Sequence, residues 1–291
     1  MEAWTVRRML AWMEQDFAAK GLDSPRLDAE VLLALALQVE RIRLYLDLDR
    51  PLNETERNAV RGFVQRRRGR EPVAYIRGWR EFWGRRFRVT PDVLIPRPDT
   101  ETLVEAALAR IPEDGVGPVM DLCTGSGCVV VALAAERPQL EVVASDISAS
   151  ALAIATENAA SNEVQVRFVE GDLFASEPGP FALITANPPY IGEGELADLD
   201  ADVAEHEPHL ALVGGASGLE LVTRLIPEAH ARLQPGGWLL MEIGIDQANA
   251  VSALFEDAGF VEVSTVRDLG NIERVVLGRR KGDAETLPNA P

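Results

Sequence analysis

The residues Asn187-Pro188-Pro189-Tyr190 could bind a ligand or take part in a reaction. They follow an apolar run at 181–184 that is typical of a buried strand. The two prolines remove two backbone donors and hold the chain in an extended bend. The Asn187 side-chain oxygen and nearby carbonyls remain as acceptors, beside the Tyr190 ring, which can cover a flat group. Such a pocket suits a planar NH2 group. The alternative interpretation is a strand that merely ends at a Pro-Pro turn.

A glycine-rich loop is the second candidate site. Segment 120–127 reads as a strand end followed by a loop that opens a helix, and the loop residues are Cys123, Thr124, Gly125, Ser126 and Gly127. Glycines are needed where a ligand approaches backbone N–H groups closely and where φ must be positive. The loop lacks the Gly-Lys-Ser/Thr ending of a P-loop and is not a full Gly-x-Gly-x-x-Gly fingerprint.

Polar residues also follow the next two predicted strands. Asp146 ends the first of them, and Gly171-Asp172-Leu173-Phe174 follows the second. A carboxylate at the position of Asp146 can accept hydrogen bonds from both hydroxyls of a ribose. Taken alone, each aspartate is equally typical of a helix cap or a turn. Their shared position at successive strand ends favours a site for an adenosine without phosphates.

The elements that must position these residues alternate along the second part of the chain. Strands are predicted near 119 and at 141–145, 164–169, 181–185, 238–243, 261–266 and 275–277. Helices are predicted after Pro98 and at 129–136, 149–160, 218–233 and 247–258. Alternating units of this kind predict an α/β fold with an open, mostly parallel sheet of seven strands and helices on both faces. Ligands should then bind at the carboxyl ends of the strands.

The first part of the chain reads as a small helical bundle at 1–78. Ser24 is expected to cap a helix that runs through Leu37, and Asn53 with Glu56 resembles a capping box that opens another. A hairpin linker is predicted at 79–92, the α/β domain at 93–280, and a flexible tail at 281–291.

Composition limits the class of protein. The 291 residues suggest two domains, and hydrophobic and charged fractions of 47% and 26% are ordinary for a globular protein. The sequence has no apolar run of membrane-spanning length and no signal-peptide pattern, which predicts a cytoplasmic location. Cys123 and Cys128 are expected to be reduced thiols. The three histidines have no zinc spacing, so no metal is expected.

The net charge of −17 is unevenly distributed. Residues 1–90 hold 18 Lys and Arg against 13 Asp and Glu, a net +5, and the remainder has a net −22. A body this acidic should repel a phosphate backbone, which makes nucleic acid an unlikely partner of the α/β domain. The segment 57–88 contains eleven arginines and is either a solvated face or a surface for an acidic partner.

The glycine loop, Asp146, Asp172 and the Asn187–Tyr190 tetrapeptide together resemble a class I S-adenosylmethionine-dependent methyltransferase that modifies amino groups. Further segments narrow this resemblance, and they are Pro72–Ile76, Glu81–Gly84, Leu94–Glu101, Glu207-Pro208, Ala211-Leu212, Gly218-Leu219, Pro235–Gly237, Glu242–Gly244 and Asp268–Gly270. With them, nearly the whole chain resembles the release-factor glutamine methyltransferase family, PrmC/HemK. The chain departs from the family pattern with Cys123 in place of a glycine, Leu173 in place of a tryptophan and His206 in place of a phenylalanine.

The resemblance implies a Rossmann-like methyltransferase sheet and methyl transfer from S-adenosylmethionine to the side-chain amide nitrogen of a glutamine in class-1 peptide release factors. The catalytic residues would be Asn187, Pro188, Pro189 and Tyr190. Asn187 Oδ1 and the Pro188 carbonyl would accept the two amide N–H bonds, and Tyr190 would pack on the amide plane. Cofactor-binding residues would be Cys123, Thr124, Gly125, Ser126, Gly127, Asp146, Asp172, Leu173 and Asn187, with Arg97 and Thr100 shaping the pocket lid. A helix-start role explains Thr100 nearly as well.

Two other functions remain open at this point. The Asn187–Tyr190 pattern also suits exocyclic amines of nucleobases, so a DNA or RNA methyltransferase is one alternative. Ribosomal RNA would then be bound by the basic N-terminal part. A non-catalytic protein that keeps the fold as a cofactor-binding adaptor is the other. The chain is expected to act as a monomer.

Overall fold

The computed structural model describes residues 3–113, 117–174 and 177–282 and divides into two compact units. One unit consists of the chain up to Gly78 together with Asp200–His206, and the other of Trp79–Leu199 and the chain from Glu207 onward. Most of the expected tail at 281–291 lies outside the described residues. The described residues include no helix that is long and apolar enough to span a membrane.

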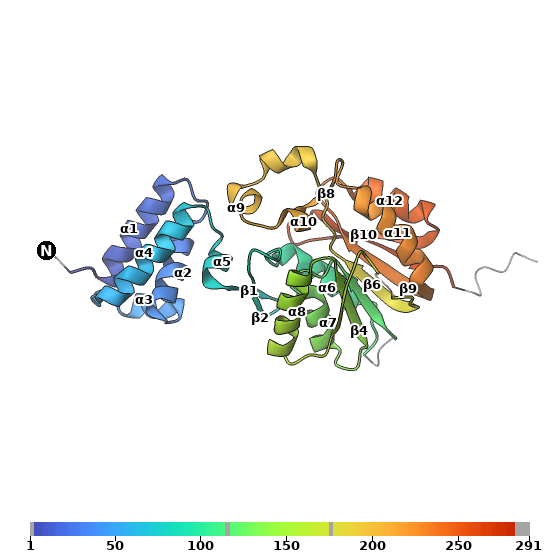
Figure 1. Ribbon diagram of the computed structural model, residues 1–291, viewed down its shortest axis with the longest axis horizontal. Helices are drawn as coiled ribbons and strands as arrows, with labels where there is room; N and C mark the ends of the chain where they lie inside the picture. Colours follow the sequence, from blue (N-terminus) through green and yellow to red (C-terminus); the bar gives the residue numbers. More distant parts are fainter. Residues whose placement is uncertain (1–2, 114–116, 175–176, 283–291) are drawn as a thin grey trace, which may run out of the picture. The chain divides into compact units, whose positions relative to one another are not determined.

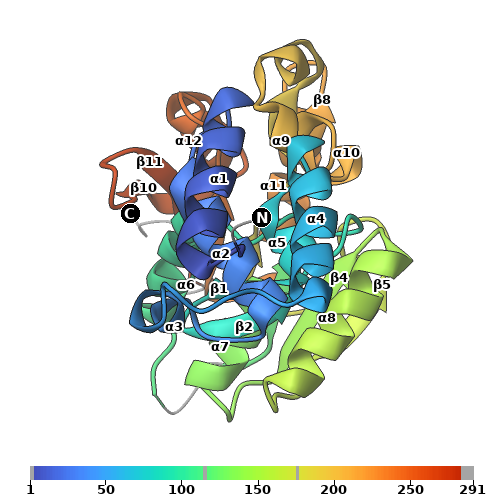
Figure 2. The same cartoon turned by 90° about the vertical axis from the view of Figure 1, so that its left-hand side faces the viewer.

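The first unit is helical, as predicted, and Figure 2 shows its helices α1 to α5 in blue to cyan and α9 in yellow. Its helices are α1 (Val6–Ala19), α2 (Pro25–Leu37), α3 (Arg41–Leu46), α4 (Glu54–Arg68), α5 (Val73–Arg77) and α9 (Ala201–Ala204). Helix α2 contacts both α1 and α4, and their apolar faces enclose a core that includes Met13, Phe17 and Leu33.

The ends of these helices test two predictions about capping. The capping box at the start of α4 is confirmed, because Asn53 Oδ1 accepts from Glu56 N and Glu56 Oε2 accepts from Asn53 N, each at 2.9 Å. The helix predicted to follow Ser24 is confirmed at Pro25–Leu37 with Ser24 at its N-cap position, but within the described chain the Ser24 side chain makes no capping hydrogen bond. Pro25 at the first turn presets the helical φ instead.

A buried arginine attaches α9 to the rest of the first unit. The Arg67 side chain is 5% exposed and forms ion pairs of 2.7 Å with Asp28 and with Asp202. His206 Nε2 lies 2.8 Å from the Gly69 carbonyl oxygen. These contacts explain why a segment from the second half of the sequence belongs to the helical unit, which sequence patterns did not predict.

The second unit begins with the predicted hairpin, formed by β1 (Trp79–Phe82) and β2 (Arg85–Arg88). Both residues of the two-residue turn, Trp83 and Gly84, have positive φ, at 51° and 65°. Two consecutive left-handed residues match the twist of an antiparallel pair, and glycine adopts this conformation without strain. The hairpin then leads to η1 (Pro98–Thr100) and α6 (Glu101–Leu108).

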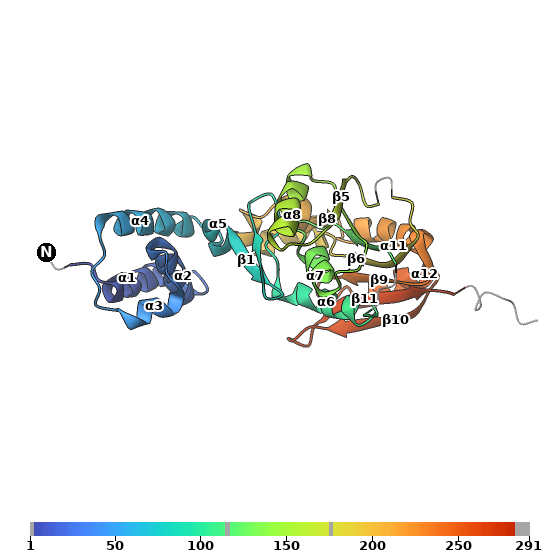
Figure 3. The ribbon, with the colours of Figure 1, turned by 90° about the horizontal axis from the view of Figure 1, so that it is seen from below.

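A twisted sheet forms the centre of this unit (Figure 1). It has seven strands in the order β10-β11-β9-β6-β3-β4-β5. Its strands are β3 (Val119–Leu122), β4 (Val142–Asp146), β5 (Arg167–Glu170), β6 (Phe181–Ala186), β9 (Leu233–Glu242), β10 (Phe260–Arg267) and β11 (Glu273–Arg280). Strand β11 runs antiparallel to both of its neighbours, and the other pairs are parallel. The mostly parallel sheet is therefore confirmed, and Figure 3 shows the antiparallel β10 and β11 in red.

Helices cover both faces of the sheet because alternate strand residues are apolar on both sides. Helices α6, α7 (Cys128–Glu136) and α8 (Ala149–Ser161) pack with Val119, Leu183 and Leu240 in one core. Helices α11 (Glu220–Arg232) and α12 (Ala248–Asp257) pack with the alternate residues, including Ile184 and Met241. Buried strands with apolar residues on both faces are typical of parallel sheets.

The segment between β6 and α11 contains short elements that the sequence did not predict. They are β7 (Ile191–Gly192), η2 (Glu193–Asp198), α10 (His209–Leu212) and β8 (Val213–Gly215). Strands β7 and β8 form a separate parallel pair. They are too short and too rich in glycine to leave an alternating apolar pattern.

Candidate functional site

A cavity of about 560 Å³ opens in the second unit at the carboxyl ends of the parallel strands. Its walls include most of the residues that the sequence singled out: Arg97, Thr100, Cys123, Thr124, Gly125, Ser126, Asp146, Asp172, Leu173, Asn187 and Pro189. Gly127, Pro188 and Tyr190 are not among the described residues that line it. The carboxyl ends of β3, β4, β5 and β6 all contribute, as the parallel topology requires.

The glycine loop follows β3 and takes left-handed backbone conformations at three positions, with φ of 55° at Cys123, 54° at Gly125 and 78° at Gly127. A left-handed Cys123 explains why glycine suits this position better than cysteine. Gly127 caps α7, and a Cβ there would come within 3.1 Å of the Ala155 Cβ on α8. Gly127 therefore lets two helices approach, while the loop before it faces the cavity.

Both thiols of this region are protonated. Burial raises the pKa of the Cys123 and Cys128 thiols far above the ordinary value, and nearby carboxylates raise it further. Thiolate is the reactive form of cysteine. Neither cysteine is therefore suited to act as a nucleophile.

Asp146 ends β4 with its carboxylate at the cavity wall. Its Oδ2 accepts from Gly125 N at 2.8 Å and its Oδ1 from Ser148 N at 2.9 Å. Burial raises the pKa of this carboxyl, and the backbone hydrogen bonds counteract the shift by stabilising the charged form. Each oxygen keeps a lone pair beyond its backbone bond, so Asp146 can still accept two hydroxyl groups.

Asp172 and Leu173 follow β5 and differ in exposure. The Asp172 side chain is 52% exposed and pairs with Arg224 of α11. Leu173 is buried, with φ of 50°, and its carbonyl accepts from Ser145 Oγ. Leu173 therefore presents an apolar wall to the cavity, whereas Asp172 lies in an exposed ion pair.

Asp121 is a site residue that sequence reasoning missed. It is buried in β3, lines the cavity, and accepts from Thr124 Oγ1 at 2.6 Å and from Thr185 Oγ1 at 2.7 Å. Burial raises the pKa of its carboxyl to about 6. An acidic residue inside the apolar strand Val119–Leu122 was the available signal, since a buried carboxylate needs specific partners.

The Asn187–Tyr190 turn follows β6, and its two ends are held by side chains from other elements. Asn187 Nδ2 donates to Thr100 Oγ1 at 3.3 Å, and Thr100 is buried. Gln247 Nε2 donates to the Tyr190 carbonyl at 2.9 Å. Burial raises the pKa of Tyr190 to about 12, so this side chain stays a neutral phenol.

Arg97 lies at the cavity wall in an ion pair that the sequence did not predict. Its Nη2 lies 2.6 Å from Glu207 Oε1, and Glu207 Oε2 accepts from Ile95 N at 3.2 Å. The Glu207 side chain is 1% exposed. Glu207 therefore fixes the segment 95–97 at the wall, and its pairing with an arginine 110 residues away left no local signal.

Glycines bring β8 and the following turn against the backbone of the Asn187–Tyr190 turn. A Cβ on Gly214 would collide with the Pro189 carbonyl oxygen, and one on Gly218 with the Tyr190 carbonyl oxygen. Gly218 also has a φ of 78°. Strand β8 and the turn after it therefore pack closely against the Asn187–Tyr190 turn and support it.

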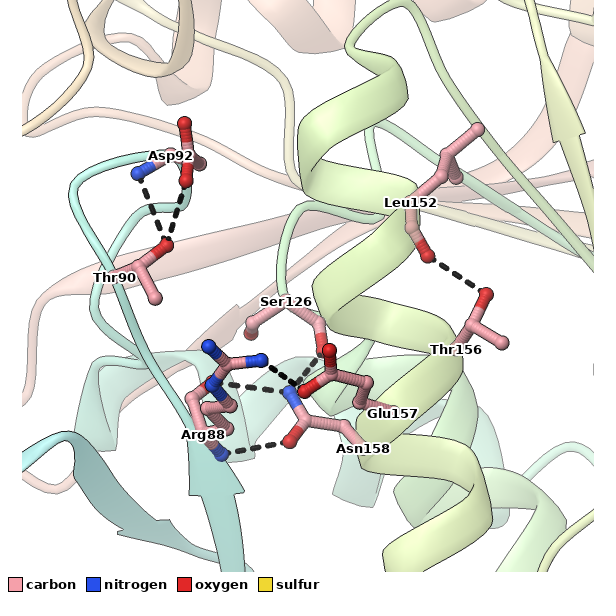
Figure 4. Close-up of polar contacts among 8 residues, drawn as sticks. All are labelled: Arg88, Thr90, Asp92, Ser126, Leu152, Thr156, Glu157 and Asn158. Atoms are coloured by element: carbon pink, nitrogen blue, oxygen red, sulfur yellow. Dashed lines mark hydrogen bonds and ion pairs between the residues drawn. The ribbon is translucent and has the colours of Figure 1, made fainter.

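Asn158 of α8 joins the hairpin to the glycine loop (Figure 4). Its Oδ1 accepts from Arg88 N at 2.6 Å, and its Nδ2 donates to Arg88 O at 3.1 Å and to Ser126 O at 2.9 Å. Asn158 is 1% exposed. An asparagine on the buried face of an alanine-rich helix was the signal for this link.

We expect Gly214→Ala to lower the free energy of unfolding by about 1–3 kcal/mol, because the new Cβ must displace the Pro189 backbone. Chemical denaturation followed by circular dichroism measures the effect. Gly194→Ala is the matched control, since a Cβ there meets nothing within 4 Å. Equal stability of the two variants would contradict the close fit.

Asn158→Ala should also lower the free energy of unfolding, by about 1–3 kcal/mol, because it leaves the buried Ser126 carbonyl and the part-buried Arg88 backbone groups without their partner. Asn162→Ala, at the C-cap of α8 one turn later, removes more exposed bonds to Arg86 O and Asn158 O and should cost less. Urea denaturation compares the two variants. A larger loss for Asn162→Ala would refute the role given to Asn158.

Comparisons with known proteins agree with this architecture. Residues 8–78 match the PrmC N-terminal domain and residues 99–205 the methyltransferase small domain. The solved structure of the T. thermophilus 16S rRNA N2 G1207 methyltransferase, in complex with AdoMet and guanosine, covers 70% of this chain and 50% of its own, with a TM-score of 0.53 and 20% identity. At this identity the likeness concerns the fold alone.

Relatives of much higher identity span nearly the whole chain. The release factor glutamine methyltransferase of Geobacter sulfurreducens is 46% identical over 281 residues, which cover 96% of this chain and 98% of that protein. The protein of the same name from Koribacter versatilis is 44% identical and covers 91% of this chain and 96% of its own length. With the glycine loop, Asp146 and the Asn187–Tyr190 turn around one cavity, this similarity shows that the chain belongs to the release factor glutamine methyltransferase family.

Proposed function

We propose that this chain transfers a methyl group from S-adenosylmethionine to the side-chain amide nitrogen of the glutamine in the Gly-Gly-Gln motif of class-1 peptide release factors. Family membership supports this assignment, since its relatives bear the name release factor glutamine methyltransferase. Methylation of these factors would act on translation termination and would take place in the cytoplasm. The two cysteines, which form no disulfide, are compatible with that location. We also propose that the enzyme acts as a monomer.

The charge of the cavity fits S-adenosylmethionine better than a nucleotide. Five acidic side chains line it, namely Asp92, Asp121, Asp146, Asp172 and Glu220. The basic side chains among the described residues that line it, Arg97 and Arg224, are already paired with carboxylates. An acidic wall favours a sulfonium cation and repels phosphates.

Individual residues of the wall match the parts of the cofactor. We propose that Asp146 accepts the ribose hydroxyls, that Leu173 packs on the adenine, and that the loop Cys123–Gly127 offers backbone N–H groups. Arg97 and Thr100 would shape the wall indirectly, through Glu207 and Asn187 respectively. When bound, S-adenosylmethionine supplies the electrophilic methyl group.

The observation that carries the substrate assignment is the position of Asn187. Its Nδ2 is engaged by Thr100, which leaves Oδ1 as an acceptor at the cavity. We propose that Oδ1 and the Pro188 carbonyl accept the two N–H bonds of the substrate amide, with Pro189 and Tyr190 shaping and packing the amide site. The raised pKa of Tyr190 supports a packing role.

Positioning rather than base catalysis would supply most of the rate enhancement. An amide nitrogen is a poor nucleophile because its lone pair is delocalised into the carbonyl. Holding reactants in line lowers a barrier by roughly 7–11 kcal/mol, whereas a general base contributes about 10²–10⁴-fold in rate. The several bonds that fix the Asn187–Tyr190 turn are consistent with this emphasis.

Asn187→Ala should reduce methyl transfer by at least about 10²-fold, the loss typical of removing one group that is aligned with the reacting atoms. Transfer of radiolabel from S-adenosylmethionine to release factor measures turnover, and calorimetry should find cofactor binding retained. Asn249→Ala, on an exposed face of α12, is the control. Wild-type turnover in Asn187→Ala would exclude the role, and label transfer to ribosomal RNA or DNA instead would favour the nucleobase alternative.

The arginine-rich segment 57–88 is a second part of the proposal, as a docking surface for the release factor. Several of its arginines already pair within the chain, among them Arg66 with Glu71, Arg68 with Asp16 and Arg88 with Glu157. Arg61, Arg80 and Arg86 are exposed and form no ion pair within the described chain that would occupy them. These three are the best candidates for contact with an acidic partner.

Reversing Arg61, Arg80 and Arg86 to Glu should raise KM for intact release factor by about 10-fold or more, with kcat little changed, because long-range attraction mainly affects encounter. The effect should weaken at high salt. Lys20→Glu, an exposed reversal outside the segment, is the control. An unchanged KM in the triple variant would reject the docking surface.

A further inference from the structure

Glu242 is a buried acid that the mechanism above does not use. It is the last residue of β9 and is 2% exposed. Ala186 of β6 pairs with Met241 of β9 in parallel register, so the next residues of the two strands are Asn187 and Glu242. The sheet itself therefore brings this carboxyl beside the Asn187 side chain.

Thr100 and Asn187 lie beside Glu242, and both lower the pKa of its carboxyl as hydrogen-bond donors. Asn187 Nδ2 also donates to Thr100 Oγ1 at 3.3 Å. Glu242 Oε2 is buried and has no hydrogen-bond partner among the described residues. Thr100 and Asn187 line the cavity, while Glu242 is not among the described residues that do. Glu242 thus acts on a ligand only through these two residues.

The orientation of the Asn187 amide is the property that such a contact controls. The two ends of an amide side chain have the same shape, and only hydrogen bonding decides which end faces the cavity. An ionised carboxylate accepts hydrogen bonds and cannot donate them. A carboxylate behind Asn187 therefore draws the NH2 end toward itself and turns Oδ1 toward the cavity.

We propose that Glu242 is a positioning residue, whose carboxylate and its bond to Thr100 hold the Asn187 amide with Oδ1 facing the substrate NH2 group. The inference rests on the proposed function, because it assigns Oδ1 to the glutamine amide. A protonated Glu242 donates a hydrogen bond and loses the preference. The orientation of Asn187, and with it the rate of methyl transfer, then depends on the charge of Glu242.

The surroundings of Glu242 set the pH at which this charge appears. Burial raises the pKa of Glu242 to about 7, against the hydrogen bonds from Thr100 and Asn187 and the charge of Arg274 on β11. Asp99 of η1 raises it further, and Glu242 in turn raises the pKa values of Tyr190 and Cys128, which keeps both of them neutral. Arg274 is itself shared with Asp99 and Asp268, each at 3.2 Å. Arg274 therefore stabilises the ionised form of Glu242 only in part.

The raised pKa also has a consequence for stability. A carboxyl whose folded pKa lies above its ordinary value of 4.5 keeps its proton in the folded protein at a pH where the unfolded chain has lost it. Its contribution therefore lowers stability as pH rises from about 4.5 to about 7. Replacing Glu242 by an uncharged residue removes this cost. A purely structural acid would instead lose stability on replacement.

The test compares wild-type protein with Glu242→Gln in release-factor methylation between pH 6 and 9. For the wild type, kcat should rise about 10-fold per pH unit below pH 7 and level off above it. Glu242→Gln should have a kcat about 10-fold lower at pH 8 and no such rise, because its amide offers a donor as well as an acceptor to Asn187. The Kd of S-adenosylmethionine by calorimetry should change less than twofold, and the midpoint of urea denaturation at pH 8 should not fall.

Two further variants complete the experiment. Glu242→Leu removes the acceptor altogether and should lose at least as much kcat, while Glu256→Gln, an exposed glutamate of α12, should match the wild type in every measurement. A Glu242→Gln protein with wild-type kcat and pH profile would overturn the positioning role, as would one that fails to fold. If the wild type itself does not methylate release factor, the proposed function fails instead, so the two failures are distinguishable.

Discussion

The parallel pairing of β6 with β3 on one side and β9 on the other is the constraint on which the site depends. This register places Asp121, Asn187 and Glu242 at or near the carboxyl ends of three adjacent strands. Thr185 of β6 donates to Asp121 of β3, and Asn187, which follows β6, lies beside Glu242 of β9. A slip of one residue in β6 would turn these polar groups to the opposite face of the sheet. The strands therefore fix both the backbone and the polar contacts that cross it.

The buried acids of this arrangement lower the stability of the folded protein. Asp121 and Glu242 are each 2% exposed, and burial raises both pKa values into the range of about 6 to 7. Neither is placed against a fully available cation, so their charge opposes folding near neutral pH. Such groups are better explained by what they orient than by what they stabilise. Asp121 holds Thr124 of the glycine loop, and Glu242 holds Asn187, so each controls one of the two parts of the cavity wall.

The sequence predicted the features that have a local pattern. Alternating apolar runs predicted the strands, and glycines at Gly125 and Gly127 predicted left-handed turns, because a single residue type suffices for each. Contacts that join distant residues left no such pattern. Thr100 lies 87 positions from Asn187, so the sequence did not predict their hydrogen bond. From its neighbours alone, Thr100 was predicted to start a helix or to shape the pocket. Segment 200–206 joins the helical unit through contacts such as Arg67 with Asp202 and His206 with Gly69, which no periodicity in the sequence reflects.

The tetrapeptide Asn187–Tyr190 owes its shape to residues outside it. Its first residue is oriented by Thr100, its carbonyls approach positions that only Gly214 and Gly218 allow, and its last carbonyl accepts from Gln247. A weak amide nucleophile needs alignment more than it needs a strong base, and alignment within a fraction of an ångström requires support from several elements. The same four residues on a free loop would keep the acceptors and lose their directions. The geometry of the turn is therefore a property of the sheet and its supporting turns, and the tetrapeptide is the part of that frame that we propose to contact the substrate.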